Sequence, residues 1–419
     1  MSRPVTFVHA ADLHLDAPFQ GVDAAEERVR SALVESTYHA LDVIVEACLA
    51  RSVDFLVLAG DVFNSADRSV RAQRRFRAAM DRLADAGVPV FVAQGNHDPA
   101  GGWSAGIEMP AAVRYFPTDR VGRFEVADPQ DPEGAPLAVL YGQGYASRAV
   151  TENLAAGYRR DPSDAVAIGV LHANVGGQAG YEPYAPCTLE DLRAARMDYW
   201  ALGHIHKPLE LSADPPVRYA GSPQGLNPKE DGPHGCLVVT IDRGQVGVEV
   251  VETSQVRWAH REVDARDLAT LDDVATAVTR ACASARAEAA GVPVVLRVEL
   301  TGRSPVHALL ARAGALDDLA ADLREAQLAE TPWVWIDRIR DVTRSEIDLE
   351  SVRTSGDFAG DLVRQADEVE ADAAALDEFV SGALSGLSAA VDLGDLDRTD
   401  ILERARDAAL DLLLVEEDR

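Results

Sequence analysis

Acidic residues, histidines and an asparagine follow five short apolar runs in the first half of the chain. The runs and their polar ends read FVHAADLH, DFLVLAGDVF, VFVAQGNHD, VAIGVLHAN and YWALGHIH. The polar residues are Asp12, His14, Asp61, Asn96, His97, Asp98, His172, His204 and His206. Asp, Asn and His without a thiolate are typical ligands of Mn²⁺, Fe²⁺ or Zn²⁺ in five- or six-coordinate sites. The set therefore predicts a metal centre, and not a closed structural zinc site.

Each motif alone has an ordinary structural interpretation. The stretch Gly95-Asn96-His97-Asp98 is typical of a turn, because Gly and Asn tolerate left-handed backbone and Asp caps helices. A single histidine such as His172 is typical of a hydrogen-bonded core residue. Five such strand ends together favour one shared site, because open α/β sheets build their sites at the carboxyl ends of strands.

The candidate ligands are numerous enough for two cations. Two cations held about 3.5–4 Å apart need a bridging carboxylate, and Asp61 is the candidate bridge from its place in the series. The other candidate ligands are Asp12, His14, Asn96, His172, His204 and His206. His97 is then left without a metal, and it is the candidate general acid.

Regular elements must bring these motifs together. Apolar runs predict strands at residues 6–10, 55–59, 88–93, 137–141, 167–172, 199–203, 218–220 and 236–241. Helical spacing predicts helices at residues 24–50 and 66–86. This alternation favours an α/β core.

A smaller unit begins near residue 257. The pattern there predicts a helix at 268–289, a strand at 294–300, a helix at 305–325 and a strand at 333–342. Acidic helices at 358–382 and 399–415 follow. We therefore predict domains at residues 1–255, 256–345 and 346–419.

The overall charge restricts the partners that the chain can bind. The 419 residues carry a formal net charge of −29, and from residue 341 onward 22 acidic residues face 7 arginines. Phosphate backbones are normally met by basic surface, so any contact with nucleic acid must be local.

The four cysteines form no CxxC pair, no secretory signal precedes them and no apolar run approaches about 18 residues. We expect a cytoplasmic protein without a membrane segment.

The ordered set D-x-H, G-D, G-N-H-D, H and G-H-x-H resembles the calcineurin-like metallophosphoesterase superfamily. Over about residues 5–240 the chain resembles the SbcD-type DNA-repair exonucleases of that superfamily. Its phrases HAADLHLDAPF and YAPCTLEDLRAARMDYWALGHIHKP resemble the YhaO subgroup. The resemblance implies a four-layer α/β/β/α sandwich, a smaller α+β capping domain and a helical, acidic C-terminal region.

The resemblance also implies roles for the site residues. It assigns one metal to Asp12, His14, Asp61 and His206, and a second metal to Asp61, Asn96, His172 and His204. A metal-bound hydroxide would attack phosphorus while His97, oriented by Asp98, protonates the leaving 3′-oxygen. The cofactors would be two divalent ions, manganese first, with iron, zinc or magnesium as alternatives.

The leading functional hypothesis is a metal-dependent DNA nuclease of DNA repair, either an exonuclease or an endonuclease. One alternative is a small-molecule or nucleotide phosphodiesterase of the same superfamily, and another is a non-catalytic scaffold for an ATPase. The resemblance implies DNA as substrate, an SbcC-like coiled-coil ATPase as partner, and a homodimer. The acidic C-terminal helices either dock that partner or pack back on the α+β domain.

Overall fold

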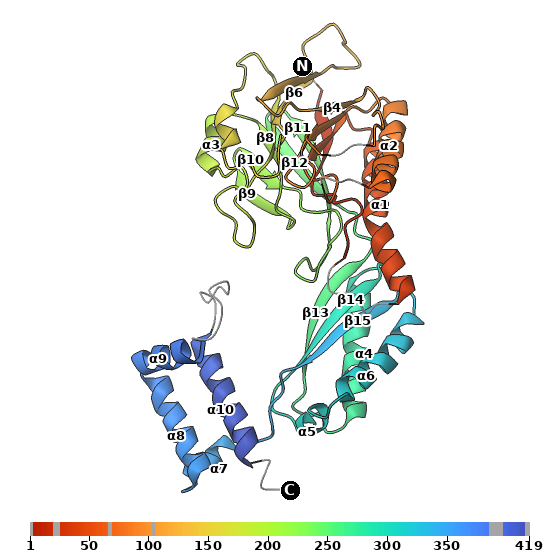
Figure 1. Cartoon of the computed structure of the whole chain (residues 1–419). Helices are drawn as coiled ribbons and strands as arrows, with labels where there is room; N and C mark the ends of the chain where they lie inside the picture. Colours follow the sequence, from red (N-terminus) through yellow and green to blue (C-terminus); the bar gives the residue numbers. More distant parts are fainter. Residues whose placement is uncertain (1–2, 20–25, 66–68, 103–104, 385–396, 415–419) are drawn as a thin grey trace. The chain divides into compact units, whose positions relative to one another are not determined.

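A computed structural model describes residues 3–19, 26–65, 69–102, 105–384 and 397–414 (Figure 1). The helix starts expected at residues 24 and 66, and the helix end expected at 415, lie outside these residues. The chain divides into two compact units, one of residues 1–259, 286–295 and 331–337, and one of residues 260–285, 296–330 and 338–419. The three-domain division stays a prediction.

The first unit contains two six-stranded sheets. One sheet has the order β12-β11-β1-β2-β3-β4, and the other has the order β5-β6-β7-β8-β10-β9. The strands of the first sheet are β1 (Val5–Ala10), β2 (Phe55–Ala59), β3 (Val90–Ala93), β4 (Val113–Tyr115), β11 (Gly235–Asp242) and β12 (Gln245–Glu252). Those of the second are β5 (Gly122–Val126), β6 (Ala138–Gln143), β7 (Ala167–His172), β8 (Tyr199–Gly203), β9 (Leu209–Ala213) and β10 (Pro216–Tyr219). Within each sheet the central neighbours β1-β2-β3 and β6-β7-β8 pair in parallel, so their carboxyl ends lie at one edge.

The apolar side chains form three layers of core around these sheets. Helices α1 (Glu27–Ala50) and α2 (Val70–Asp85) bury Ile44 and Phe76 against the outer face of the first sheet. Aromatic residues such as Phe55 and Tyr199 fill the space between the two sheets. Helix α3 (Leu189–Ala194) lies on the outer face of the second sheet (Figure 1). Trp200 is buried in one core with Leu192 of this helix. The expected four-layer α/β/β/α sandwich is confirmed.

A three-stranded sheet, with the order β13-β14-β15, follows in the chain. Its strands are β13 (Arg257–Asp264), β14 (Val294–Thr301) and β15 (Val334–Asp341), and its helices are α4 (Leu271–Glu288), α5 (His307–Leu310) and α6 (Ala315–Leu328). The helix expected at 305–325 is therefore wrong as one element. Gly314 has a φ of 85° before α6, a left-handed conformation that interrupts a right-handed helix.

The described part of the acidic tail folds into four helices, α7 (Leu349–Thr354), α8 (Phe358–Ala371), α9 (Ala373–Leu384) and α10 (Arg398–Leu414). Val363 and Leu410 are fully buried in the small core that these helices share. Asp407 of α10 forms an ion pair of 2.5 Å with Arg303, which precedes α5. This contact favours the alternative in which the tail packs back on the α+β domain. The helix expected at 358–382 is broken at Asp372, whose backbone is extended.

Among the described residues, no helix is both long enough and apolar enough to cross a membrane.

Candidate metal centre

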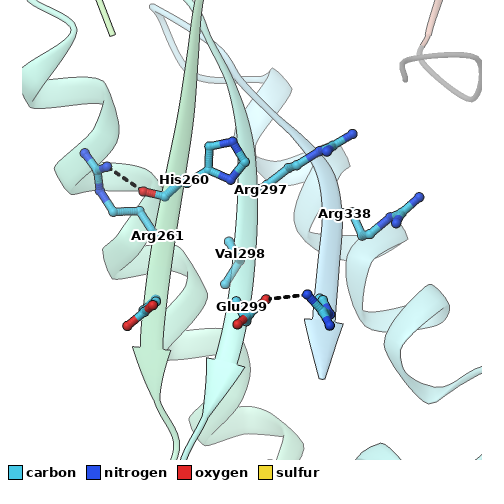
Figure 2. A pocket seen from close by; sticks show the side chains of 8 residues that line it. His260, Arg261, Arg297, Val298, Glu299 and Arg338 are labelled. Carbon is cyan, nitrogen blue, oxygen red and sulfur yellow. Dashed lines mark hydrogen bonds and ion pairs between the residues drawn. The ribbon is translucent and has the colours of Figure 1, made fainter. Parts of the chain in front are cut away.

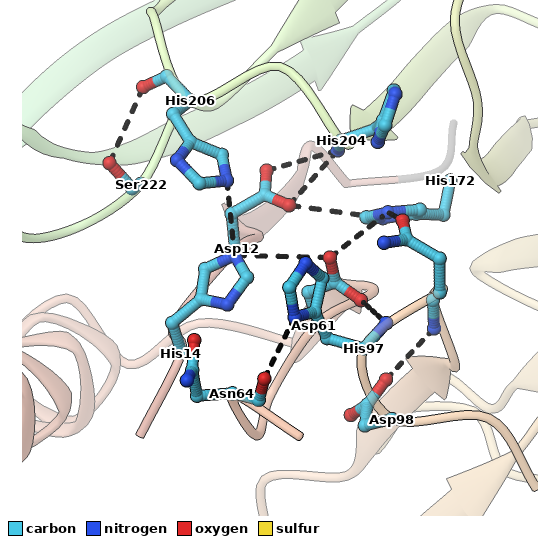
Figure 3. A network of polar contacts seen from close by, with 12 residues as sticks. Asp12, His14, Asp61, Asn64, His97, Asp98, His172, His204, His206 and Ser222 are labelled. Carbon is cyan, nitrogen blue, oxygen red and sulfur yellow. Dashed lines mark hydrogen bonds and ion pairs between the residues drawn. The ribbon is translucent and has the colours of Figure 1, made fainter. Parts of the chain in front are cut away.

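The residues singled out from the sequence meet at the carboxyl ends of β1, β2, β3, β7 and β8 (Figure 3). Four of them have left-handed backbone, with φ values of 54° at Asp12, 43° at His14, 50° at Asp61 and 101° at His204. Such φ values are rare and costly for residues with a side chain, and they cluster at functional sites. The chain therefore turns sharply after β1, β2 and β8 and directs these polar side chains into the shared site.

The first group of candidate ligands is Asp12, His14 and His206, whose ligand atoms lie within 4.8 Å of one another. The Nε2 atoms of His14 and His206 are 3.0 Å apart. His14 Nε2 also lies 3.8 Å from Asp61 Oδ2. Nδ1 of His14 is buried and has no hydrogen-bond partner among the described residues. Two imidazole nitrogens that face each other beside carboxylates form a donor set that fits a divalent cation.

A second group comprises Asp12, Asp61 and His172, and it shares Asp12 with the first group. His172 Nε2 is 3.3 Å from Asp61 Oδ2 and 3.0 Å from Asn96 Oδ1. Its Nδ1 lies 3.0 Å from the carbonyl oxygen of Ala59, which can accept the Nδ1 proton. Because Asp61 approaches the histidines of both groups, its carboxylate stays the candidate bridge between two cations.

His204 lies beside the second group. Its backbone N–H donates to both carboxylate oxygens of Asp12, at 3.0 and 3.1 Å. Its Nε2 is 2.8 Å from the carbonyl oxygen of Glu182, so a proton on Nε2 leaves Nδ1 as the free ring nitrogen. The ring centroids of His204 and His172 are 5.2 Å apart. The structure thus brings His204 to the centre, although it belongs to none of the tight groups found among the described residues.

His97 forms a third tight group with His14 and Asp61. It lies edge-on to His14, with ring centroids 4.8 Å apart. Its Nδ1 is 2.7 Å from the carbonyl oxygen of Asn64, and its backbone N–H donates to Asp61 Oδ1 at 2.8 Å. The expected orienting role of Asp98 needs correction. The Asp98 carboxylate accepts from the backbone N–H groups of Val62 and Gly95, each at 2.9 Å, so it ties two loops together while Asn64 orients the imidazole.

Burial and mutual charge shift the ionisation of the centre. Asp12 and His172 are fully buried, and Asp61 is 1% exposed. Burial raises the pKa of Asp12 to about 6 and lowers that of His14 to about 3. Burial also lowers the pKa of His172, but the charge of Asp61 outweighs it and raises this pKa to about 9. For Asp61 the favourable charge of His172 outweighs burial, and its pKa falls well below the ordinary value. At neutral pH and without a cation, His172 is therefore protonated and Asp61 is ionised.

Residues that the sequence motifs did not predict complete the site. A cavity of about 480 Å³ opens beside Asp61, and Arg148, Tyr181 and Lys229 line it. Glu230 lies against His206, and its carboxylate oxygen is 2.7 Å from Nδ1 of that ring. Burial raises the pKa of Glu230, but the hydrogen bond from His206 outweighs it and the pKa is lowered. These residues lie on loops without ligand spacing, so the sequence carries no signal for them.

Comparison with known proteins identifies the class. The family model described as calcineurin-like phosphoesterase matches residues 5–208, and the model described as metallophosphoesterase YhaO, middle domain, matches residues 258–344. The chain belongs to the calcineurin-like metallophosphoesterase family, and the family expected from the motifs is confirmed. It is 37% identical to the uncharacterized metallophosphoesterase YhaO of Bacillus subtilis (strain 168), over 83% of this chain and 84% of that protein.

Two relatives of lower identity are a DNA double-strand break repair protein and a nuclease subunit. The chain is 29% identical to the DNA double-strand break repair protein Mre11 of Methanopyrus kandleri, over 60% of this chain and 57% of that protein. It is 26% identical to one of the subunits of the nuclease SbcCD of Bacillus subtilis (strain 168), over 54% of this chain and 63% of that protein. The chain thus spans less than two thirds of either relative.

Proposed function

We propose that this metallophosphoesterase is a divalent-metal-dependent nuclease that hydrolyses phosphodiester bonds in DNA. The observation that carries the proposal is a pair of largely buried ligand groups that share Asp12. One group contains Asp61, and the other places His14 Nε2 3.8 Å from Asp61 Oδ2. The relatives Mre11 and nuclease SbcCD support DNA as the substrate class.

The clustered donor atoms support the assignment of ligands to two cations that the resemblance implied. Asp12, His14 and His206 would hold one ion and Asn96, His172 and His204 the other, with Asp61 between them. When bound, the two cations would lower the pKa of an attacking water and neutralise charge on the phosphoryl oxygens. Mixed imidazole, carboxylate and amide donors suit Mn²⁺, and Fe²⁺, Zn²⁺ and Mg²⁺ are the alternatives.

The chain supplies a proton donor for the leaving oxygen. Because Nδ1 of His97 lies 2.7 Å from the Asn64 carbonyl oxygen, the Nδ1 proton stays on that nitrogen. A protonated ring would then release its second proton from Nε2. A positioned imidazole of this kind contributes roughly 10²–10⁴-fold to a rate. Asp61 fixes the backbone of His97 by accepting its N–H at 2.8 Å, so the acid and the ligands are held by one carboxylate.

Local basic surface supports DNA, with its many backbone phosphates, as the substrate despite the acidic net charge of the chain. The exposed side chains of Arg148 and Lys229 border the cavity at the metal centre. In the second unit, His260, Arg297 and Arg338 lie on the three neighbouring strands β13, β14 and β15, along a hollow of about 440 Å³ (Figure 2). These basic side chains are few, so we expect weak DNA binding with a shallow dependence on salt, because the slope grows with the number of phosphate contacts.

The alternative of a small-molecule or nucleotide phosphodiesterase is favoured by one observation. The cavity of about 480 Å³ is within the range of pockets that enclose a small ligand. A non-catalytic scaffold is disfavoured, since a decayed enzyme would be expected to have lost some ligands. The SbcC-like ATPase partner and the homodimer stay predictions from the resemblance.

A nuclease assay on the full chain distinguishes these functions. The unaltered chain is incubated with Mn²⁺ or Mg²⁺ and with linear duplex DNA, single-stranded DNA or bis-p-nitrophenyl phosphate. The same reactions are run with His97→Ala and with the control His39→Ala, which changes an exposed histidine of α1. We expect cleavage of DNA, loss of cleavage in His97→Ala, and normal cleavage in the control. Hydrolysis of the small diester with intact DNA would favour the small-molecule alternative, and hydrolysis of neither would favour the scaffold.

A further inference from the structure

Glu230 makes three close hydrogen bonds beside the metal centre without belonging to the ligand set. Its Oε1 lies 2.7 Å from His206 Nδ1 and accepts from Asn227 Nδ2 at 2.6 Å. Its Oε2 accepts from the backbone N–H of Leu226 at 2.8 Å. The side chain of Glu230 is only 10% exposed. Both carboxylate oxygens are therefore committed, and the side chain has one orientation.

The contact with Glu230 determines which nitrogen of His206 can bind a metal. An ionised carboxylate only accepts hydrogen bonds, so Nδ1 of His206 must carry the proton. Nε2 is then the nitrogen with a free electron pair, and it lies 3.0 Å from Nε2 of His14. Histidines that ligate metals commonly donate their other N–H to a carboxylate, which fixes the ring and makes it a stronger base.

The same carboxylate closes the loop that follows β10. The backbone N–H of Glu230 donates to the Asn227 carbonyl at 3.0 Å, and the N–H of Lys229 donates to Asn227 Oδ1 at 3.0 Å. Asn227 is thus held by Glu230 and in turn holds Lys229. The Lys229 side chain is exposed and borders the cavity that opens at Asp61. One buried carboxylate therefore connects a candidate metal ligand with a cation at the cavity.

We infer that Glu230 is a positioning residue that orients His206 toward a divalent cation and also holds the loop that presents Lys229 to a substrate phosphate. The metal part of this inference rests on the contacts of His206 alone. The phosphate part rests on the proposed function, because it requires a phosphodiester in the cavity.

Metal binding to the full chain tests the first part without any substrate. The Kd for Mn²⁺ is measured by titration calorimetry for the unaltered chain, Glu230→Ala, Glu230→Gln and the control Asp231→Ala, which removes the neighbouring exposed carboxylate. We expect the Kd to rise about 10–100-fold in Glu230→Ala and to stay unchanged in the control. Glu230→Gln keeps the size of the side chain and removes its charge, so it reports on the charge if Glu230→Ala does not fold.

A spectroscopic measurement separates orientation from general damage. Long-range ¹H–¹⁵N spectra of the metal-free chain report which ring nitrogen of His206 is protonated. We expect the Nδ1–H form in the unaltered chain and in Asp231→Ala, and a mixture of forms in Glu230→Gln. A Kd for Mn²⁺ within twofold of the unaltered value in both Glu230 variants, or an unchanged tautomer in both Glu230 variants, would overturn the metal part.

Kinetics at saturating Mn²⁺ test the second part. Lys229→Ala should raise KM for a DNA oligonucleotide several-fold without changing the Kd for Mn²⁺. Glu230→Ala should raise the KM for the oligonucleotide and also the Kd for Mn²⁺. An unchanged KM in Lys229→Ala, or no cleavage of DNA by the unaltered chain, would overturn the phosphate part. Only the second of these results would also refute the proposed function, and neither bears on the binding of Mn²⁺.

Discussion

Gly60 stands between the end of β2 and Asp61, and replacing it with alanine should damage the centre without removing a ligand. Its φ is +103°, a conformation that residues with a side chain rarely adopt. A Cβ at this position would lie 2.1 Å from His172 Nδ1 and 2.6 Å from its Cγ. The imidazole must therefore move, and it would lose its contact of 3.0 Å with the Ala59 carbonyl oxygen.

The size of the effect follows from these contacts. The unfavourable φ alone costs about 1–3 kcal/mol. Overpacking of a tight core costs about 1–3 kcal/mol, and a lost buried hydrogen bond costs about 1–3 kcal/mol. Gly87→Ala is the matched control, because Gly87 has a φ of +75° and nothing lies within 4 Å of an added Cβ. Gly60→Ala should therefore lower the free energy of unfolding by about 2–6 kcal/mol more than Gly87→Ala does.

Urea unfolding of the metal-free chain measures this difference, and calorimetry measures the accompanying change in Mn²⁺ affinity. We expect displacement of His172 to weaken Mn²⁺ binding about 10–100-fold, whereas Gly87→Ala should leave it unchanged. Equal destabilisation by the two substitutions, with equal Mn²⁺ affinity, would refute the packing of His172 against Gly60.

Three further predictions follow from the site and the basic surface. Because Asp12 must lose a proton with a pKa of about 6, and His172 one with a pKa of about 9, the Mn²⁺ affinity should rise with pH between these values; affinity independent of pH would contradict these assignments. Asp98→Ala leaves the N–H groups of Val62 and Gly95 without their acceptor, so the free energy of unfolding should fall by roughly 2–6 kcal/mol. Thermal unfolding measures this change, and an unchanged Tm would argue against a role of Asp98 in joining the two loops. The double change of Arg297→Gln and Arg338→Gln should weaken the binding of duplex DNA in EDTA and lower the number of counterions released by about two. The control is the same double change at two exposed arginines elsewhere, those at positions 280 and 312. Equal weakening in both pairs would indicate an effect of net charge alone.

The sequence predicted the central strands well because these strands are buried on both faces. The expected strands at 55–59, 167–172 and 199–203 match β2, β7 and β8 residue for residue. In the two six-stranded sheets, the strands that the pattern did not predict are the four outer strands, β4, β5, β9 and β12. The pattern also did not predict β13, which is an outer strand of the three-stranded sheet. Edge strands are partly exposed, as in the alternating burial of β12, so they lack the continuous apolar run that marks a central strand.

The candidate ligands were predictable because their chemistry resides in side chains that follow strands. The groups that orient them were not. Asn64 acts through its backbone carbonyl, which every residue possesses, and Glu230 acts from a loop that only the fold brings to His206. The role expected of Asp98 was wrong for a related reason, since adjacency in sequence to His97 did not reveal that its carboxylate turns toward backbone amides.

The central claim is a centre of two cations bridged by Asp61, and anomalous X-ray scattering from crystals of the full chain grown with Mn²⁺ tests it most directly. We predict two anomalous peaks about 3.5–4 Å apart on either side of the Asp61 carboxylate. One peak would lie against His14 and His206, and the other against His172 and Asn96. A single peak, or two peaks of which neither contacts Asp61, would contradict the account.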